Sequence, residues 1–95
     1  MTGDASAVVD MSLAVPADPG YAGMVRDLAV HGARVCGCIE AKASAFGRQV
    51  EDAAREALAA AGPAGSVAVT VRRDGGPLEI SIGNGGAARS LALEI

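Results

Sequence analysis

Residues 66–83 have the sequence SVAVTVRRDGGPLEISIG, and this stretch decides the fold that we predict for the chain. Valine alternates with small or polar residues from 66 to 73, which is the pattern of a strand with one buried face. The Asp-Gly step at 74–75 tolerates the positive φ angle of a tight turn, and residues 77–83 alternate again. The stretch therefore predicts a β-hairpin whose two strands direct Val, Leu and Ile toward a common face.

Two further strands are predicted, one on either side of this hairpin in the sequence. Residues 8–15 (VVDMSLAV) alternate apolar and polar side chains, and Pro16 ends the run. Residues 90–95 (SLALEI) alternate in the same way after a glycine-rich turn at 84–86. We expect both segments to form strands that bury one face.

A helix is predicted between the first strand and the hairpin. It begins with Asp18 as N-cap and Pro19 at the first helical position, and it ends near Gly37. Its apolar positions recur at helical spacing and form one stripe, which consists of Tyr21, Met24, Val25, Leu28, Gly32 and Val35. His31 lies at the edge of that stripe, so we expect a partly buried structural histidine there.

A second helix is predicted over residues 41–61, and Gly62-Pro63 ends it. The element order is then β-α-α-β-β-β, and each element is apolar on one side, so the helices and the sheet bury those sides against each other. We predict a two-layer α/β sandwich (α+β), with two helices packed on a mainly antiparallel sheet of about four strands. Residues 1–95 form a single domain, in which residues 1–7 are a flexible N-terminus.

The composition predicts a thin hydrophobic core. Hydrophobic residues make up 51% of the 95 residues, but Phe46 and Tyr21 are the aromatic ones. A core of Val, Leu, Ile and Ala buries little area per residue, so a partner protein or a homodimer is a reasonable source of additional stability.

Charge and patterning argue against several functions. The net charge is −3 and the basic residues are dispersed, which is not typical of a nucleic-acid-binding protein. The chain lacks a signal-peptide pattern and a bilayer-spanning apolar run, so we expect a cytoplasmic protein with no membrane partner. Cys36 and Cys38 lie near His31, but no fourth ligand is apparent and no metal site is expected. The simpler interpretation of the cysteines is small apolar residues at a helix end, which leaves any further role open.

Three motifs in order resemble one protein superfamily. They are VPADPGYAGMVRDLAV at 15–30, EALAA at 56–60 and ISIGNGG at 80–86. Together they resemble the histidine-kinase-like (GHKL) ATPase superfamily, and most of all the small anti-sigma-factor serine kinases of bacteria. The resemblance covers residues 8–86 and implies a truncated Bergerat-like ATP-binding fold.

The departures from the family motifs imply a degenerate nucleotide site. In the family, a glutamate on the second helix orients the attacking hydroxyl, and an asparagine four residues later holds magnesium. This chain keeps the glutamate as Glu56 but has Ala60 in place of the asparagine, and alanine offers no oxygen ligand. Asn84 stands where an Asp would accept a hydrogen bond from adenine, and Gly86 follows it. After Gly86 the sequence has no room for the family's lid over the triphosphate. We therefore predict a pseudo-ATPase without catalytic residues, cofactor or enzymatic activity.

The leading hypothesis is a non-catalytic protein-interaction module with a regulatory role. The resemblance implies that the first helix binds a sigma factor, an antagonist or another regulator, and that nearby surfaces form a homodimer. The candidate contact residues are Tyr21, Arg26, Asp27 and Arg34. Two alternatives stay open: a residual nucleotide or small-ligand binder at Glu56, Asn84 and Gly86, and a structural component that self-assembles through its sheet edges.

Overall fold

The computed structural model of the chain describes residues 8–61, 65–83 and 88–94. The predicted flexible segment 1–7, the helix stop at Gly62-Pro63, and the site positions Asn84 and Gly86 lie outside the described residues. Within the described ranges, neither helix has the length and apolar character needed to cross a bilayer.

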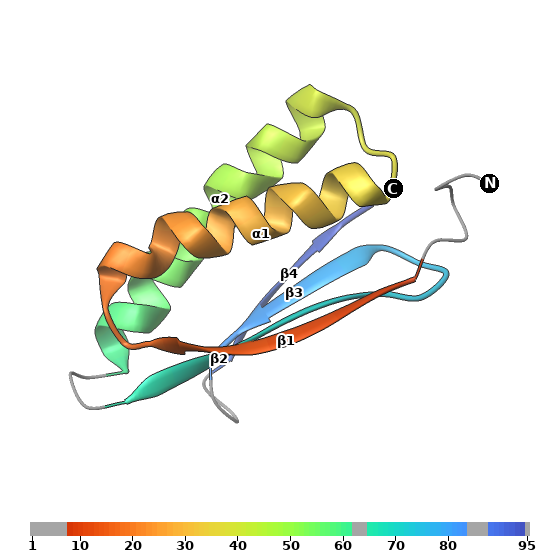
Figure 1. Ribbon diagram of the computed structural model, residues 1–95. Coiled ribbons are helices and arrows are strands. Elements are labelled where there is room, and N and C mark those ends of the chain that lie inside the picture. Colours follow the sequence, from red (N-terminus) through yellow and green to blue (C-terminus); the bar gives the residue numbers. More distant parts are fainter. Residues whose placement is uncertain (1–7, 62–64, 84–87, 95) are drawn as a thin grey trace.

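The predicted order β-α-α-β-β-β is confirmed (Figure 1). Its elements are β1 (Val9–Pro16), the single 3₁₀ turn η1 (Pro19–Tyr21), α1 (Ala22–Val35), α2 (Glu40–Ala60), β2 (Ser66–Arg73), β3 (Leu78–Ile82) and β4 (Arg89–Leu93). The two helices form one layer and the sheet forms the other, as expected for an α+β sandwich.

The sheet is antiparallel throughout, with strand order β1-β2-β3-β4. β1 pairs with β2 in unbroken register from Val9 opposite Arg73 to Pro16 opposite Ser66, although both helices intervene in the sequence. The predicted last strand pairs with β3 of the same chain. β1 and β4 are therefore the two edges of the described sheet.

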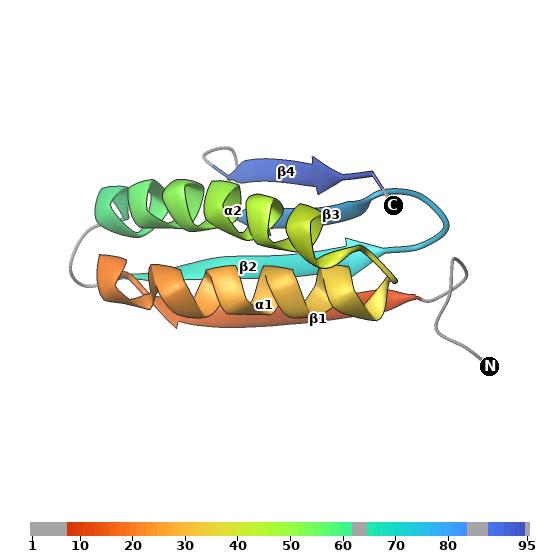
Figure 2. The ribbon, with the colours of Figure 1, turned by 90° about the horizontal axis from the view of Figure 1, so that it is seen from above.

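The helices cover one face of the sheet, as seen from above in Figure 2. α1 lies over β1 and β2, α2 lies over β3, and β4 extends beyond α2. The register aligns four hydroxyl side chains across the opposite face, which no described element covers: Ser12, Thr70, Ser81 and Ser90.

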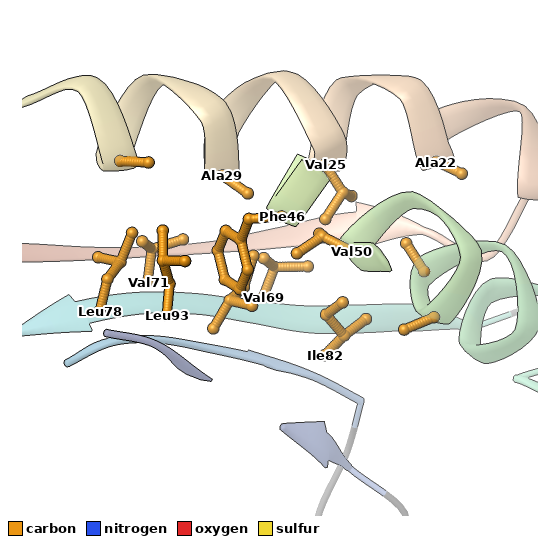
Figure 3. Close-up of a cluster of buried hydrophobic side chains, with 14 of the residues drawn as sticks. Ala22, Val25, Ala29, Phe46, Val50, Val69, Val71, Leu78, Ile82 and Leu93 are labelled. Atoms are coloured by element: carbon orange, nitrogen blue, oxygen red, sulfur yellow. The ribbon is translucent and has the colours of Figure 1, made fainter. Parts of the chain in front are cut away.

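The core lies between the two layers and has one aromatic side chain, Phe46 of α2 (Figure 3). Phe46 is only 3% exposed, and it lies between Val25 and Ala29 of α1 and the valines of β2. The remaining buried side chains are mostly Val, Ile, Leu and Ala. The prediction of a core built from small aliphatic residues is thus confirmed.

Gly47 lets the two helices approach closely. A Cβ atom at this position would lie 2.5 Å from Cγ2 of Val30 and 3.2 Å from Cγ of Arg26, both on α1. Real Cβ atoms do not approach neighbours at 2.5 Å, so any larger residue at position 47 requires the Val30 side chain or the helices to move. This contact fixes which side of α1 faces α2.

Local signals in the sequence set the ends of the helices and the hairpin. The Asp18 carboxylate accepts a hydrogen bond from the Gly20 amide at 2.9 Å and caps the turn that opens with Pro19. Gly37 has φ of +87° just after α1, and Gly75 has φ of +77° in the hairpin turn. Both are conformations that L-residues with a side chain rarely adopt.

Candidate functional site

A hollow of about 280 Å³ lies between the C-terminal part of α2 and the sheet. Its lining residues are Glu56, Ala57, Ala60, Ala61, Val67, Gly83 and Arg89. It brings together Glu56 and Ala60, two of the predicted nucleotide-site positions, and it borders Gly83, the residue before Asn84.

Inside this hollow the Glu56 carboxylate accepts a hydrogen bond from the Arg89 guanidinium. Both side chains are largely exposed, at 67% for Glu56 and 50% for Arg89. Sequence reasoning missed Arg89, because it is a single basic residue at the start of a strand and only the folded sheet places it opposite α2.

The walls of the hollow offer little to a metal ion. Ala57, Ala60 and Ala61 contribute methyl groups on the α2 side, whereas magnesium takes oxygen ligands. Across the described part of the chain, no three His, Cys, Asp or Glu side chains are grouped so that they could hold a metal. Cys36 is a buried free thiol at the end of α1 and Cys38 is a half-buried one.

The candidate contact residue Arg26 is held by two carboxylates. Its Nε and Nη2 donate to Asp27 at 3.1 and 3.0 Å, and its Nη1 donates to Glu51 of α2 at 3.3 Å. The hydrogen bonds and charge of Asp27, followed by the charge of Glu51, raise the pKa of Arg26. Arg26 and Asp27 thus already form an ion pair within the chain, and the ion pair of Arg26 with Glu51 links α1 to α2.

Arg34, another candidate contact residue, forms a two-pronged pair with Glu40. Its Nε donates to Oε1 at 2.9 Å and its Nη2 donates to Oε2 at 2.7 Å. This pairing raises the pKa of Arg34 and lowers the pKa of Glu40. Ser44 donates a further hydrogen bond to Glu40 at 3.3 Å. The pair joins the last turn of α1 to the first turn of α2. The negative charge of Glu40 at the N-terminus of α2 also interacts favourably with the helix dipole.

The apolar stripe predicted on α1 divides into a buried part and an exposed part. Val25 and Gly32 are buried, whereas Tyr21, Met24 and Val35 are 39%, 43% and 44% exposed. We call the less buried side of the helix the α1 seam. It consists of Tyr21, Met24, the partly buried Leu28, the exposed His31 and Val35, which alternate steps of three and four residues. This spacing places the seam along one side of the helix.

The prediction that His31 is partly buried is wrong, because this side chain is exposed. Val30 and Arg26 mark the side of α1 that faces α2, so the seam lies on the opposite side. Since β1 is the edge strand beneath α1, no described element lies beyond it to cover His31.

The seam continues onto the inner face of β1. Met11 and Leu13 of this edge strand pack against the core but are only partly buried. We call the α1 seam together with these two side chains the edge face. It combines half-exposed apolar side chains with a strand edge that pairs with no other described strand.

No protein-family model matches the sequence, and a search of curated proteins finds no match. The resemblance to the GHKL ATPases therefore stays a prediction. The fold and the two regions described above are the basis for the function proposed below.

Proposed function

We propose that this chain is a non-catalytic protein-interaction module, built on an anti-sigma-factor-like ATPase scaffold, that binds a regulatory protein through its edge face. The observation that supports this most is the α1 seam, where Tyr21, Met24 and Val35 are each about two-fifths exposed beside an open strand edge. Contiguous apolar side chains at a surface mark interaction sites in many proteins.

Of the predicted contact residues, Tyr21 belongs to this surface. Aromatic residues of this kind are enriched at the centres of protein interfaces. Arg26, Asp27 and Arg34 already have partners within the chain, so they are better suited to an interface rim, where ion pairs influence orientation and association rate more than affinity.

The hollow at the end of α2 supports the non-catalytic part of the proposal. Phosphoryl transfer depends on metal-assisted charge stabilisation and positioning of the phosphates. Ala60 supplies no metal ligand and Glu56 is paired with Arg89. We therefore expect no ATPase or kinase activity.

The interaction is tested by capturing proteins from a cytosolic extract of the source cells on the immobilised chain. Met24→Asp places a charge in the seam, whereas Gln49→Asp places one on the exposed side of α2 and serves as the matched control. We expect a specific protein that the wild type and Gln49→Asp retain and Met24→Asp loses. Equal capture by all three chains, or no capture by any, would contradict the proposal.

A second candidate function, binding of a small ligand, is favoured by the position of the hollow, where Glu56 and Ala60 of the predicted nucleotide site lie beside the Arg89 guanidinium. Calorimetric titration with ATP and with ADP, each with and without Mg²⁺, separates the two. Under the leading proposal no micromolar binding is detected. Micromolar binding that Arg89→Ala abolishes would replace the pseudo-ATPase interpretation with a ligand-binding one.

A further inference from the structure

We propose that Cys36 and Cys38 form a redox pair, which a peroxide converts reversibly into a disulfide, and that this bond loosens the turn that joins α1 to α2. Both residues are free thiols in the structure, and neither belongs to the hollow or to the edge face. Transient disulfides between neighbouring cysteines serve as oxidant sensors in other proteins. The inference goes beyond the proposed function, because it concerns the joint between the helices and not the bound protein.

The two cysteines lie on either side of Gly37, in the turn that ends α1. The Cys38 amide donates to the Ala33 carbonyl oxygen at 3.0 Å, and the Gly37 amide donates to the Arg34 carbonyl oxygen at 3.0 Å. These bonds, with a positive φ at Gly37, form the Schellman end of a helix, in which the chain turns back toward the helix. Cys36 is 2% exposed in the core and Cys38 packs against the same core, so both thiols lie on the core side of the turn.

The backbone of this turn brings the two cysteines within reach of a disulfide. Residues two apart on a helical turn have Cα atoms about 5.4 Å apart, and a residue in the left-handed conformation of Gly37 keeps that separation with the opposite hand. Disulfides join residues whose Cα atoms are about 4.4–6.8 Å apart. A Cβ atom at Gly37 would have no neighbour within 4 Å, so the turn has space to adjust while the bond forms.

The difference in burial sets the order of the reaction. Cys38 is half-buried and accessible to a small oxidant, whereas Cys36 is enclosed by the core. A peroxide therefore reaches the Cys38 sulfur first. Cys36 then acts as the resolving thiol, because the turn already holds it next to the oxidised residue.

The reaction balances with one molecule of hydrogen peroxide. The Cys38 sulfur attacks a peroxide oxygen, the O–O bond breaks, and one water molecule leaves while Cys38 becomes a sulfenic acid. The Cys36 sulfur then attacks the Cys38 sulfur, the S–O bond breaks, and a second water molecule leaves with the Cys36 proton. The peroxide is reduced and the two thiols are oxidised to one disulfide. A dithiol reductant reverses the bond by thiol–disulfide exchange.

The disulfide should disturb the helix end that the thiols stabilise. Its sulfur atoms are bonded at about 2.05 Å, so the Cys36 sulfur leaves its packed position in the core or the Cys38 backbone moves inward. Either movement acts on the last turn of α1, where the Cys36 amide donates to the Gly32 carbonyl oxygen at 3.1 Å. Val35, the last residue of the α1 seam, directly precedes Cys36. Oxidation would therefore change the end of the helix that contributes to the edge face.

The chemistry is tested on the purified, folded chain treated with hydrogen peroxide and then with iodoacetamide, which traps the remaining thiols. Trypsin cleaves after Arg34 and Lys42, so one peptide, residues 35–42, contains both cysteines. We expect this peptide to lose two hydrogen atoms, to carry no alkyl group, and to regain both thiols with dithiothreitol. Two alkylated thiols, a disulfide between two chains, or Cys38 oxidised to a sulfinic acid without a bond would overturn the inference.

Serine variants test the assigned order. In Cys36→Ser the reaction should stop at a Cys38 sulfenic acid, which dimedone traps. In Cys38→Ser the buried Cys36 should stay reduced at the peroxide concentration that oxidises the wild type. Rapid oxidation of Cys36 in Cys38→Ser would contradict the order. The digest of the unmutated chain decides the pairing even where a variant fails to fold.

Hydrogen exchange measured by NMR on the reduced and oxidised wild type tests the structural consequence. Exchange at the Cys36 and Cys38 amides should be about tenfold faster after oxidation, because their bonds at the helix end weaken, while exchange in β3 (Leu78–Ile82) should not change. A disulfide that leaves these amides equally protected would overturn the loosening of the joint. Neither measurement involves a partner, so a failure here is distinguishable from a failure of the proposed function.

Discussion

At the scale of single residues, the helix–helix contact at Gly47 gives the sharpest prediction. Gly47→Ala adds a methyl group that would lie 2.5 Å from Val30, whose branched side chain has little freedom to move. Overpacking of this kind costs about 1–3 kcal/mol, which outweighs the gain of about 1 kcal/mol in helix propensity. Urea unfolding should therefore show a net loss of stability.

Gly23 provides the matched control within α1. A Cβ atom there would meet Nη2 of Arg26 at 3.8 Å, which is an ordinary contact. Gly23→Ala should accordingly raise stability by about 0.5–1 kcal/mol, because only the helix-propensity gain remains. Adding Val30→Ala to Gly47→Ala should recover part of its loss. A Gly47→Ala chain at least as stable as the wild type would contradict the close contact.

Single residues also mark the limit of prediction from sequence. Asp18, Gly37 and Gly75 have the expected local roles, because capping and positive φ angles depend only on neighbouring residues. His31 and Arg89 were not anticipated correctly, because their surroundings depend on which element lies beside them in the folded chain.

At the scale of elements, the joint between α1 and α2 should depend on pH. Arg34 lowers the pKa of Glu40 in the folded chain, so the carboxylate is more acidic there than in the unfolded chain. A carboxyl group whose pKa is lower in the folded chain stabilises the fold fully at pH values above its unfolded-state pKa. This contribution is lost as the pH falls through its folded-state pKa. The pH range over which this stability is lost therefore lies below 4.5, the ordinary pKa of a glutamate carboxyl group.

Comparing the wild type with Glu40→Gln tests this joint. The variant should be slightly less stable at pH 7, and the difference should vanish at acid pH, where both chains lack the charge. Glu94→Gln, at a carboxylate with no ion pair among the described residues, should follow the wild type throughout. A Glu40→Gln difference that persists unchanged in acid would show that the pair contributes nothing through charge.

The elements themselves were largely predictable. The strand and α2 boundaries agree with the sequence prediction to within two residues, because alternation, helical spacing and Gly or Pro breaks are local signals. The start of the first helix differs, since η1 forms a 3₁₀ turn before α1 begins. The candidate site was less predictable. Glu56 and Ala60 line the hollow together with Arg89, and Arg89 belongs to a strand that is far from them in the sequence.

At the scale of the whole molecule, the thin core should make stability unusually dependent on Phe46. It is the one aromatic side chain in the core, and Phe→Ala changes at buried sites cost about 3–5 kcal/mol. Small domains have total stabilities of about 5–15 kcal/mol, so Phe46→Ala should leave the chain close to unfolding. Thermal unfolding followed by circular dichroism measures this directly.

Tyr21 is the matched aromatic for this comparison, because it is 39% exposed. Tyr21→Ala should lower the stability of the chain by much less than Phe46→Ala, because most of the Phe46 side chain is buried and the Tyr21 side chain is not. Similar losses of stability in the two variants would show that the core does not depend on Phe46 as described.

The pairing of β1 with β2 has a consequence for the rate and order of folding. Pro16 and Ser66 are neighbours in the sheet but about 50 residues apart in the chain, whereas β2, β3 and β4 follow one another through short connections. Closing the long loop costs entropy before its contacts form, so we expect the β2–β4 meander to form first and β1 last. In stopped-flow measurements Val15→Ala should then mainly speed unfolding, and Ile80→Val should mainly slow folding. Until β1 docks, β2 is the open edge of the partly formed sheet. At that stage the N-terminal strand of another chain can pair with β2 in place of the chain's own β1, which would produce a domain-swapped dimer.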